Sequence, residues 1–218
     1  MASATPEPVA LAILAKAPVA GSVKTRLIPA LGADGAAALH ARLIERTVET
    51  ACAAAIGPVM LWMTPGPHPC FTALASRFPI SLAAQPDGDL GPRMLAACQA
   101  ASGPTIVIGS DCPALTPSHL RQAADVLRDG NDVVVVPAED GGYVLIGSRR
   151  PQPNLFTGMT WSTDQVMAQT RRRLAHGGLA WREFPPLWDV DRPEDLARLR
   201  GAGFAYLLDG ANSSGATL

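Results

Sequence analysis

Basic residues cluster in one short loop near the start of the chain, at residues 16–27, which read KAPVAGSVKTRL. Lys16, Lys24 and Arg26 bring three positive charges to this loop, and Gly21 lets its backbone approach a ligand closely. Exposed backbone N–H groups and basic side chains together bind phosphate oxygens. The loop therefore predicts a site for a di- or triphosphate, although a solvated basic surface loop would have the same composition.

This basic loop differs from the known glycine-rich phosphate loops. A Walker A loop requires glycine before its lysine, and Val23 precedes Lys24 here. The dinucleotide pattern G-x-G-x-x-G is absent as well. A P-loop hydrolase of nucleoside triphosphates is therefore the weaker alternative. Because Lys24 and Arg26 lie between a strand and a helix, we expect both side chains to be partly exposed and to repel each other in the empty protein.

Two acidic motifs supply candidate metal ligands. Residues 109–113 read GSDCP and contain Asp111, and residues 188–196 read WDVDRPEDL and contain Asp189 and Asp191. Carboxylates at such positions hold Mg²⁺ or Mn²⁺ against phosphate oxygens. We expect Asp111 and Asp191 to lie within one metal shell, although Asp111 could instead accept N–H bonds in its own turn and Asp191 could cap a helix.

A third motif, PAEDGGY at residues 137–143, follows an all-valine run. Two adjacent glycines at a strand end suggest a place where a ligand passes close to the backbone. Glu139 or Asp140 would then be available as an acceptor or a base. An ordinary hairpin turn around Asp140 and Gly141 explains the same residues equally well.

The elements that position these motifs alternate along the chain. Short apolar runs bounded by Gly, Pro and Asp predict strands at 9–15, 59–63, 80–84, 105–109, 132–137 and 143–147, and longer periodic segments predict helices at 33–56, 92–101 and 117–128. The pattern predicts an α/β fold in which helices cover both faces of a mainly parallel sheet. Helix starts are expected at Thr116, with Pro117, at Ser162 and at Asp191. Ligands of such sheets bind beyond the carboxyl ends of the strands.

The composition of the chain excludes some classes of binding partner. The 18 Lys and Arg residues balance 19 Asp and Glu, so net charge does not draw the chain to nucleic acid or an anionic membrane. The four cysteines are scattered without a zinc pattern and fit a cytoplasmic protein, and the first apolar run is too short to span a bilayer. We expect one domain at residues 9–208 with disordered tails at 1–8 and 209–218.

The motifs together resemble a known family. AKAPxxGxVKTRL, GDLGPRM at 88–94, GSDCP, AEDGGY, WST at 161–163 and DVDxPEDL are similar to the bacterial selenodomain-associated transferases, which are commonly named GT-A-fold glycosyltransferases. Relatives of that family include the molybdenum-cofactor and phospholactate guanylyltransferases. The resemblance implies a three-layer αβα, Rossmann-like nucleotide-diphospho-sugar transferase fold. It runs from about residue 11 to residue 199.

The resemblance also implies roles for individual residues. Lys24 and Arg26 would bind phosphate, Asp111 would be the principal metal ligand, and Asp191 would be the second. Together with these, the candidate nucleotide- and phosphate-binding residues are Lys16, Gly21, Gln85, Asp89 and Arg93. The candidate acceptor-binding residues are Glu139, Gly141, Gly142, Tyr143, Trp161 and Ser162. Trp161 could stack on a ring of the acceptor or simply cover the core.

These observations predict a Mg²⁺- or Mn²⁺-dependent transferase that uses a nucleotide-diphospho-sugar or a nucleoside triphosphate and a small acceptor. Lys24, Asp111 and Asp140 are its candidate catalytic residues. Sugar transferases of this fold usually carry Asp-x-Asp after the fourth strand, whereas Asp111-Cys-Pro113 is closer to the Asp-x-Pro of nucleotidyltransferases. A nucleotide-binding module without catalysis is the alternative from a different class.

Overall fold

The fold was analysed in a computed structural model that describes residues 6–209. Residues 1–5 and 210–218, on which most of the expected tails fall, lie outside the described residues. Within the described part of the chain, no helix combines the length and the apolar character needed to cross a membrane.

A seven-stranded sheet forms the centre of the fold. Its strands are β1 (Ala10–Lys16), β2 (Val59–Thr64), β3 (Ile80–Ala84), β4 (Thr105–Ile108), β5 (Val133–Pro137), β6 (Tyr143–Ser148) and β7 (Trp181–Glu183), in the order β3-β2-β1-β4-β6-β5-β7. Neighbouring strands are parallel except at β6, which runs antiparallel to both β4 and β5. The prediction of a mainly parallel α/β sheet is therefore confirmed.

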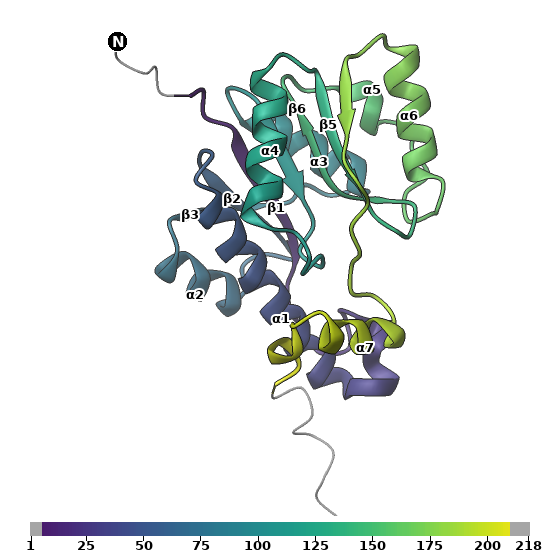
Figure 1. Ribbon diagram of the computed structural model, residues 1–218. Helices are drawn as coiled ribbons and strands as arrows, with labels where there is room; N and C mark the ends of the chain where they lie inside the picture. The colour runs from purple at the N-terminus through teal and green to yellow at the C-terminus, as the bar shows by residue number, and fades with distance from the viewer. Residues whose placement is uncertain (1–5, 210–218) are drawn as a thin grey trace, which may run out of the picture.

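Helices cover both faces of the sheet (Figure 1). On one face α1 (Ile28–Ala54), α2 (Pro69–Arg77) and α4 (Pro117–Arg128) share a buried apolar cluster with the strands. On the other face α3 (Leu90–Ala100), α5 (Pro153–Phe156) and α6 (Val166–His176) share a second cluster. This is the expected three-layer αβα arrangement. It explains the uninterrupted apolar runs of the strands, because both of their sides are covered.

A third apolar cluster lies below the carboxyl edge of the sheet. There α7 (Pro193–Gly201) and the short helix η2 (Ala205–Leu208) pack against the first half of α1 (Figure 1). Trp188 and Val190, from the segment that leads into α7, are buried in the same cluster. The packing fixes the position of that segment, which carries two of the candidate acidic residues.

The four valines of β5 are at most 2% exposed, so both faces of this strand are buried. The strand nevertheless lies next to the edge of the sheet, where only the short strand β7 flanks it. Sequence patterns also missed β7, whose three residues are mostly exposed and carry no apolar alternation. The helices α2 and α5 were not assigned either, and α6 was predicted only by its start.

Two of the three predicted helix starts were misplaced. Thr116 caps α4 as expected, and its side chain accepts from the His119 N–H. Ser162 instead lies in a turn with φ 61°, and α6 begins later, at Val166. Asp191 does not cap α7, because Pro193 takes the first helical position and makes Arg192 the capping residue. The main part of α1 begins after Gly32 (φ 70°, ψ 167°), close to the predicted residue 33.

Gly91 and Gly201 provide a matched test of how α3 is packed. A Cβ on Gly91 would collide with the Phe156 carbonyl and lie 2.8 Å from Trp161 Nε1, whereas one on Gly201 meets nothing within 4 Å. We expect Gly91→Ala to lower the free energy of unfolding by about 2 kcal/mol. Gly201→Ala should leave it unchanged or raise it by up to about 1 kcal/mol. Urea unfolding measures both, and equal stability of the two variants would contradict the packing of Trp161 on α3.

Candidate functional site

The motif residues gather at the carboxyl edge of the sheet. Because six of the seven strands run in one direction, the segments after β1, β3, β4, β5 and β7 all emerge at this edge. The antiparallel strand β6 starts there too, so the β5–β6 hairpin joins the same group. The topology thus places the motifs that follow β1, β3, β4, β5 and β7 on one side of the molecule.

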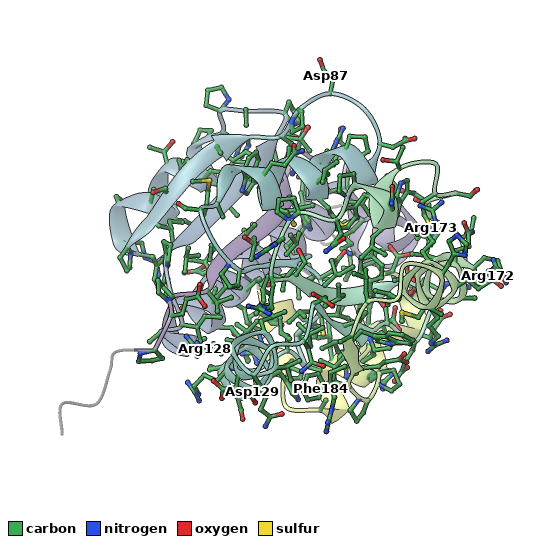
Figure 2. The ribbon with its side chains drawn as sticks, turned by 90° about the horizontal axis from the view of Figure 1, so that it is seen from above. Asp87, Arg128, Asp129, Arg172, Arg173 and Phe184 are labelled. Atoms are coloured by element: carbon green, nitrogen blue, oxygen red, sulfur yellow. The ribbon has the colours of Figure 1, made fainter. Side chains whose placement is uncertain are left out.

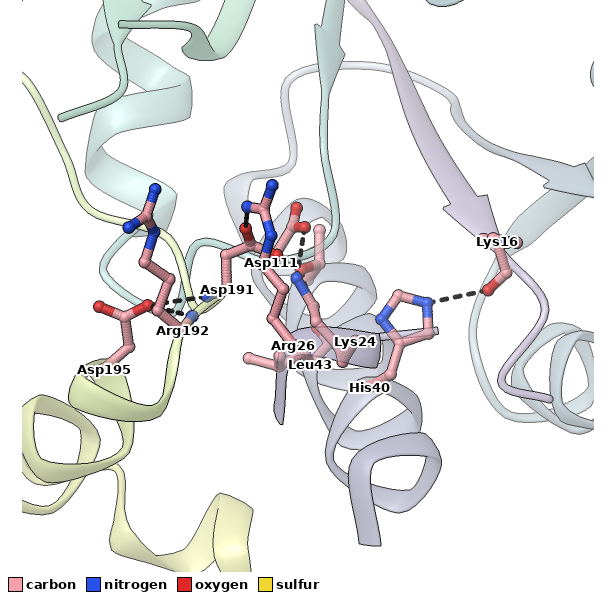
Figure 3. Close-up of polar contacts among 10 residues, drawn as sticks. Lys16, Lys24, Arg26, His40, Leu43, Asp111, Asp191, Arg192 and Asp195 are labelled. Carbon is pink, nitrogen blue, oxygen red and sulfur yellow. Dashed lines mark hydrogen bonds and ion pairs between the residues drawn. The ribbon is translucent and has the colours of Figure 1, made fainter. Parts of the chain in front are cut away.

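Lys24 and Asp111 form the central contact of this edge. The Lys24 ammonium nitrogen Nζ donates to Asp111 Oδ2 over 2.7 Å (Figure 3). The Lys24 side chain is only 5% exposed, while that of Asp111 is 39% exposed. Lys24 also adopts left-handed backbone angles (φ 46°, ψ 41°) at the start of η1 (Thr25–Leu27), a conformation that is costly for a residue other than glycine. Such strain is found most often where a side chain is held for function.

A second ion pair lies beside the first, between Arg26 and Asp191 (Figure 3). Both of its side chains are substantially exposed, at 64% and 40%. The backbone connects the two acidic segments, because the Val190 N–H donates to the Asp111 carbonyl over 2.9 Å. The expectation of partial exposure therefore holds for Arg26 but not for the side chain of Lys24, and the expected mutual repulsion is wrong because each is neutralised by its own carboxylate.

Burial and charge act in opposite directions on the Lys24–Asp111 pair. Burial alone would raise the pKa of the Asp111 carboxyl, but the adjacent ammonium outweighs it and holds that pKa below its ordinary value. Burial likewise would lower the pKa of Lys24, and Asp111 outweighs it, so the pKa of Lys24 is raised. Both groups are therefore charged over the whole neutral range.

The Asp191 carboxylate is not used to cap α7, because the Asp195 carboxylate accepts from the backbone there. The Asp195 carboxylate accepts from the backbone N–H groups of Asp191 and Arg192, over 2.9 and 2.7 Å (Figure 3). Asp189 lies in the same segment and has a different environment. Burial, followed by the charges of Asp111 and Asp140, raises the pKa of Asp189 to about 6.

The carboxylates at this edge fit a divalent cation that is shared with phosphates. Burial raises the pKa of Asp189 most, and the neighbouring carboxylates of Asp111 and Asp140 raise it further; a bound cation would offset the part due to these charges. Between residues 6 and 209, no three His, Cys, Asp or Glu side chains converge closely enough to hold a metal ion by themselves. Mg²⁺ commonly binds to one or two carboxylates, substrate phosphates and water rather than to an all-protein cage.

Other predicted phosphate ligands form a separate group at the same edge. Gln85 donates from Nε2 to the carbonyls of Ala15 and Trp62 over 3.2 and 2.8 Å, and its Oε1 accepts from Arg93. Asp89 is exposed at the start of α3, in a loop that projects outward at Asp87 (Figure 2). The structure brings Gln85 and Arg93 together and leaves Asp89 without a side-chain capping bond.

Two further residues shape the basic loop itself. Lys16 is exposed, and its ammonium group donates to the Ser22 carbonyl over 2.7 Å, which closes the loop on itself. Gly21 adopts φ 78°, a conformation that other residues rarely take, and a Cβ there would meet nothing within 4 Å. The backbone angle therefore accounts for this glycine, and its surroundings are open.

The β5–β6 hairpin confirms the turn interpretation of PAEDGGY. Asp140 Oδ1 accepts from the Gly142 N–H over 2.9 Å within the turn. Gly141 adopts φ 94°, and a Cβ there would collide with the backbone of Asp164. The close backbone approach inferred for this glycine is therefore made by the chain itself. Glu139 is held by Arg198 in a two-point ion pair with contacts of 2.6 and 2.8 Å.

Tyr143 and Trp161 pack on α3. Their rings meet edge to face, with centroids 6.3 Å apart, and Trp161 lies against Gly91. The Tyr143 hydroxyl lies 3.8 Å from the Met94 sulfur, and burial raises the pKa of Tyr143 well above its ordinary value. Ser162 next to Trp161 is exposed. Of the predicted acceptor pocket, the structure therefore brings the two aromatic residues together as a partly buried wall.

Sequence reasoning missed two residues of this edge. Arg198 pairs with Glu139 and lies over the Trp188 ring, 4.6 Å from its centroid, so it ties the hairpin to α7. His40 is buried in α1, and its Nε2 lies 3.0 Å from the Lys16 carbonyl (Figure 3). His40 lies one residue after Leu39 and three before Leu43, so its spacing placed it beside the apolar face of α1. Nothing in the sequence indicated that it reaches the basic loop.

Comparisons with known proteins agree with this geometry. The family described as "Uncharacterized protein conserved in bacteria (DUF2064)" matches residues 47–163, more than half of the 218 residues. No curated protein matches the chain significantly. Among solved structures, a Desulfovibrio desulfuricans G20 protein provisionally named a nucleotide-diphospho-sugar transferase is 26% identical, with a TM-score of 0.77 over 93% of this chain and 97% of that one.

Two more distant structures show likeness of fold alone. CMP:2-keto-3-deoxy-manno-octonic acid synthetase, solved in complex with CTP, is 14% identical with a TM-score of 0.59, over 92% of this chain and 100% of that one. The protein Rv0371c from Mycobacterium tuberculosis H37Rv, solved in complex with manganese, is 17% identical with a TM-score of 0.51, over 88% and 97%. The predicted nucleotide-diphospho-sugar transferase fold is confirmed.

The two ion pairs are expected to contribute differently to stability. We expect Lys24→Met to lower the free energy of unfolding by about 1–2 kcal/mol at pH 7, less than for a fully buried pair because Asp111 is partly exposed. Arg26→Met, at the exposed pair, should change it by less than about 0.5 kcal/mol. Chemical unfolding of the two variants beside the parent protein measures the difference.

The pH dependence of the same difference has a defined sign. Because the pKa of Asp111 is lowered, its contribution is present above the unfolded value of about 3.9 and is lost as the pH falls through the folded value. Because the pKa of Lys24 is raised, its contribution is present below about 10.4 and is lost as the pH rises through the folded value. A parent-minus-Lys24→Met difference that stays constant down to pH 2 would contradict the pair.

Proposed function

The chain belongs to the bacterial DUF2064 family, and from this premise we propose that the protein is a metal-dependent transferase acting on a nucleotide-diphospho-sugar or nucleoside triphosphate donor. The 26% identical structure named for such a transferase supports the proposal over nearly the whole chain. The four unpaired cysteines, all within the described residues, are in keeping with a reducing compartment such as the cytoplasm. The acceptor would be a small molecule.

One observation carries the proposal: the basic loop and the acidic segments face each other as two ion pairs, Lys24–Asp111 and Arg26–Asp191. Basic side chains suited to phosphate and carboxylates suited to a metal ion neutralise each other in these two pairs. A metal–polyphosphate complex carries both complementary charges. It could therefore insert between the two sets and give each a new partner, with little rearrangement of the backbone.

The residues then have separable tasks. Lys24 and Arg26 would bind phosphate oxygens and hold the leaving phosphate in place. Asp111, together with Asp191 or Asp189, would hold Mg²⁺ or Mn²⁺. The bound metal ion supplies neutralisation of the charge that develops on the departing phosphate. Asp140, at the hairpin, is the candidate to accept a proton from the acceptor.

The side chains after β4 bear on which group is transferred. A single carboxylate, Asp111, is followed by Cys112 and Pro113, in place of the Asp-x-Asp usual in sugar transferases of this fold. This favours nucleotidyl transfer, in which pyrophosphate leaves, over glycosyl transfer, in which a nucleoside diphosphate leaves. The CTP-bound structure of similar fold provides support of the same kind.

Metal-dependent nucleotide binding tests the proposal. In calorimetric titrations with a panel of nucleoside triphosphates and nucleotide sugars, we expect at least one ligand to bind at least about tenfold more tightly with Mg²⁺ than with EDTA. The double variant Lys24→Ala, Arg26→Ala should lose about tenfold or more in that affinity, because contacts to charged groups contribute about 1.5–3 kcal/mol each. Arg149→Ala, Arg150→Ala removes two charges at the opposite edge and should bind like the parent. Binding without metal dependence would favour a silent nucleotide-binding module.

Asp111→Asn tests the metal ligand separately. Asn still accepts a hydrogen bond from Lys24 but loses the charge that holds a cation, so the fold should persist. We expect turnover of the donor identified above to fall at least about a hundredfold, which corresponds to roughly 2.7 kcal/mol of barrier. Release of pyrophosphate or nucleoside diphosphate measures it, with the surface variant Asp125→Asn as control. Turnover within a few-fold of the parent rate would remove Asp111 from the metal site.

A further inference from the structure

His40 lies directly beneath the basic loop and is 5% exposed. Its Nε2 lies 3.0 Å from the Lys16 carbonyl oxygen, which can only accept, so Nε2 carries a proton and donates it. Burial, followed by the nearby Lys24 charge, lowers the pKa of His40. The ring is therefore neutral, and its other nitrogen, Nδ1, is a hydrogen-bond acceptor.

This acceptor has no partner. Among the buried side-chain nitrogen and oxygen atoms of the described residues, His40 Nδ1 alone lacks a hydrogen bond. The equivalent atoms of His68 and His119 each accept from a backbone N–H, over 3.2 Å, at the start of a helix. Buried polar atoms are nearly always paired, so an orphan of this kind calls for an explanation.

The unpaired nitrogen is turned toward Lys24. Figure 3 shows the His40 ring between Lys16 and Lys24, with the Nε2 edge on Lys16 and the Nδ1 edge on the side of Lys24. The Lys24 ammonium is turned to Asp111 instead. The Lys24 charge acts on the His40 ring, while its ammonium group donates to Asp111, so the acceptor Nδ1 is left unused.

Metal binding would change the hydrogen-bond partners of Lys24. An ammonium group has three protons to donate, and the Lys24 side chain is too buried, at 5% exposed, for water to take them all. Once a cation occupies the Asp111 carboxylate, Lys24 must find other acceptors. A phosphate oxygen supplies one, and His40 Nδ1 is the buried acceptor available for another.

We propose that His40 is a positioning residue that accepts a hydrogen bond from Lys24 through Nδ1 when a metal–polyphosphate is bound, and so aims the ammonium group at the phosphates. The inference rests on the proposed function, because it requires a polyphosphate at Lys24. His40 itself does not touch the donor in this arrangement. It acts through Lys24, while its Nε2 keeps the end of β1 attached to α1.

A double-mutant cycle between His40 and Lys24 tests this role, with Mg²⁺ and inorganic tripolyphosphate as the calorimetric probe. We expect His40→Phe to weaken the affinity for this probe about tenfold, the effect of losing one hydrogen bond to a charged group. In a Lys24→Ala background the same change should have an effect of about twofold or less. Equal effects in both backgrounds would show that His40 acts only through the Lys16 carbonyl and would overturn the proposal. His176→Phe, at an exposed position of α6, is the control.

Two conservative variants distinguish the roles of Nδ1 and Nε2 of His40. Asn at position 40 can place an acceptor near the position of Nδ1, whereas Gln can place a donor near the position of Nε2. We expect His40→Gln to be the more stable variant in urea and His40→Asn to bind Mg²⁺–tripolyphosphate more tightly. The reverse order of affinities would contradict an acceptor role for Nδ1.

Nitrogen NMR of the parent protein tests the same role without relying on the folding of any variant. The protein has four histidines, which ¹⁵N labelling makes visible. We expect the resonance of the unprotonated His40 Nδ1 to move upfield when Mg²⁺ and tripolyphosphate are added, because this nitrogen gains a hydrogen bond. An unmoved His40 resonance despite calorimetric binding would overturn the role of His40 alone. No calorimetric binding of the probe to the parent would contradict the proposed phosphate site itself, and the role of His40 with it.

Discussion

The contact on which the rest of the site depends is the ion pair between a nearly buried lysine, Lys24, and a half-buried carboxylate, Asp111. Removing an ammonium group from water is costly unless a partner compensates for it. Asp111 is that partner, and the burial of Lys24 is tolerated only because of it. The same pair makes the site responsive, since any ligand that competes for Asp111 must also give Lys24 a new acceptor.

The surrounding structure holds both partners in place from several directions. The Val190 N–H fastens the segment after β7 to the Asp111 carbonyl, and the cluster around Trp188 fixes that segment against α1 and α7. Arg198 bridges α7 to the β5–β6 hairpin through Glu139. His40 fastens the end of β1 to α1 on the other side. Loops that carry function are thus anchored to rigid elements, which limits the entropy lost when a ligand binds.

The antiparallel strand β6 adds a hairpin to the edge of the sheet that carries the candidate site. In a purely parallel sheet the segment after β5 would lead away into a crossover, but here it turns back at once and leaves the hairpin at the carboxyl edge. Asp140 comes close enough for its charge to raise the pKa of Asp189. The cost is a tight fit, because Gly141 packs on the backbone of Asp164 and leaves no room for a side chain.

By itself the sequence determined the local features, because these depend on neighbouring residues. Uninterrupted apolar runs predicted the six longer strands, and helical periodicity predicted α1, α3 and α4. The loop motifs indicated which edge of the sheet carries the candidate site. Only the tertiary structure decided the pairings. Lys24 and Asp111 are 87 residues apart and Arg26 and Asp191 are 165 apart, so their contact follows from strand order and from the packing of α7. The same holds for His40, which is an ordinary residue of an apolar helix until the fold places the basic loop above it.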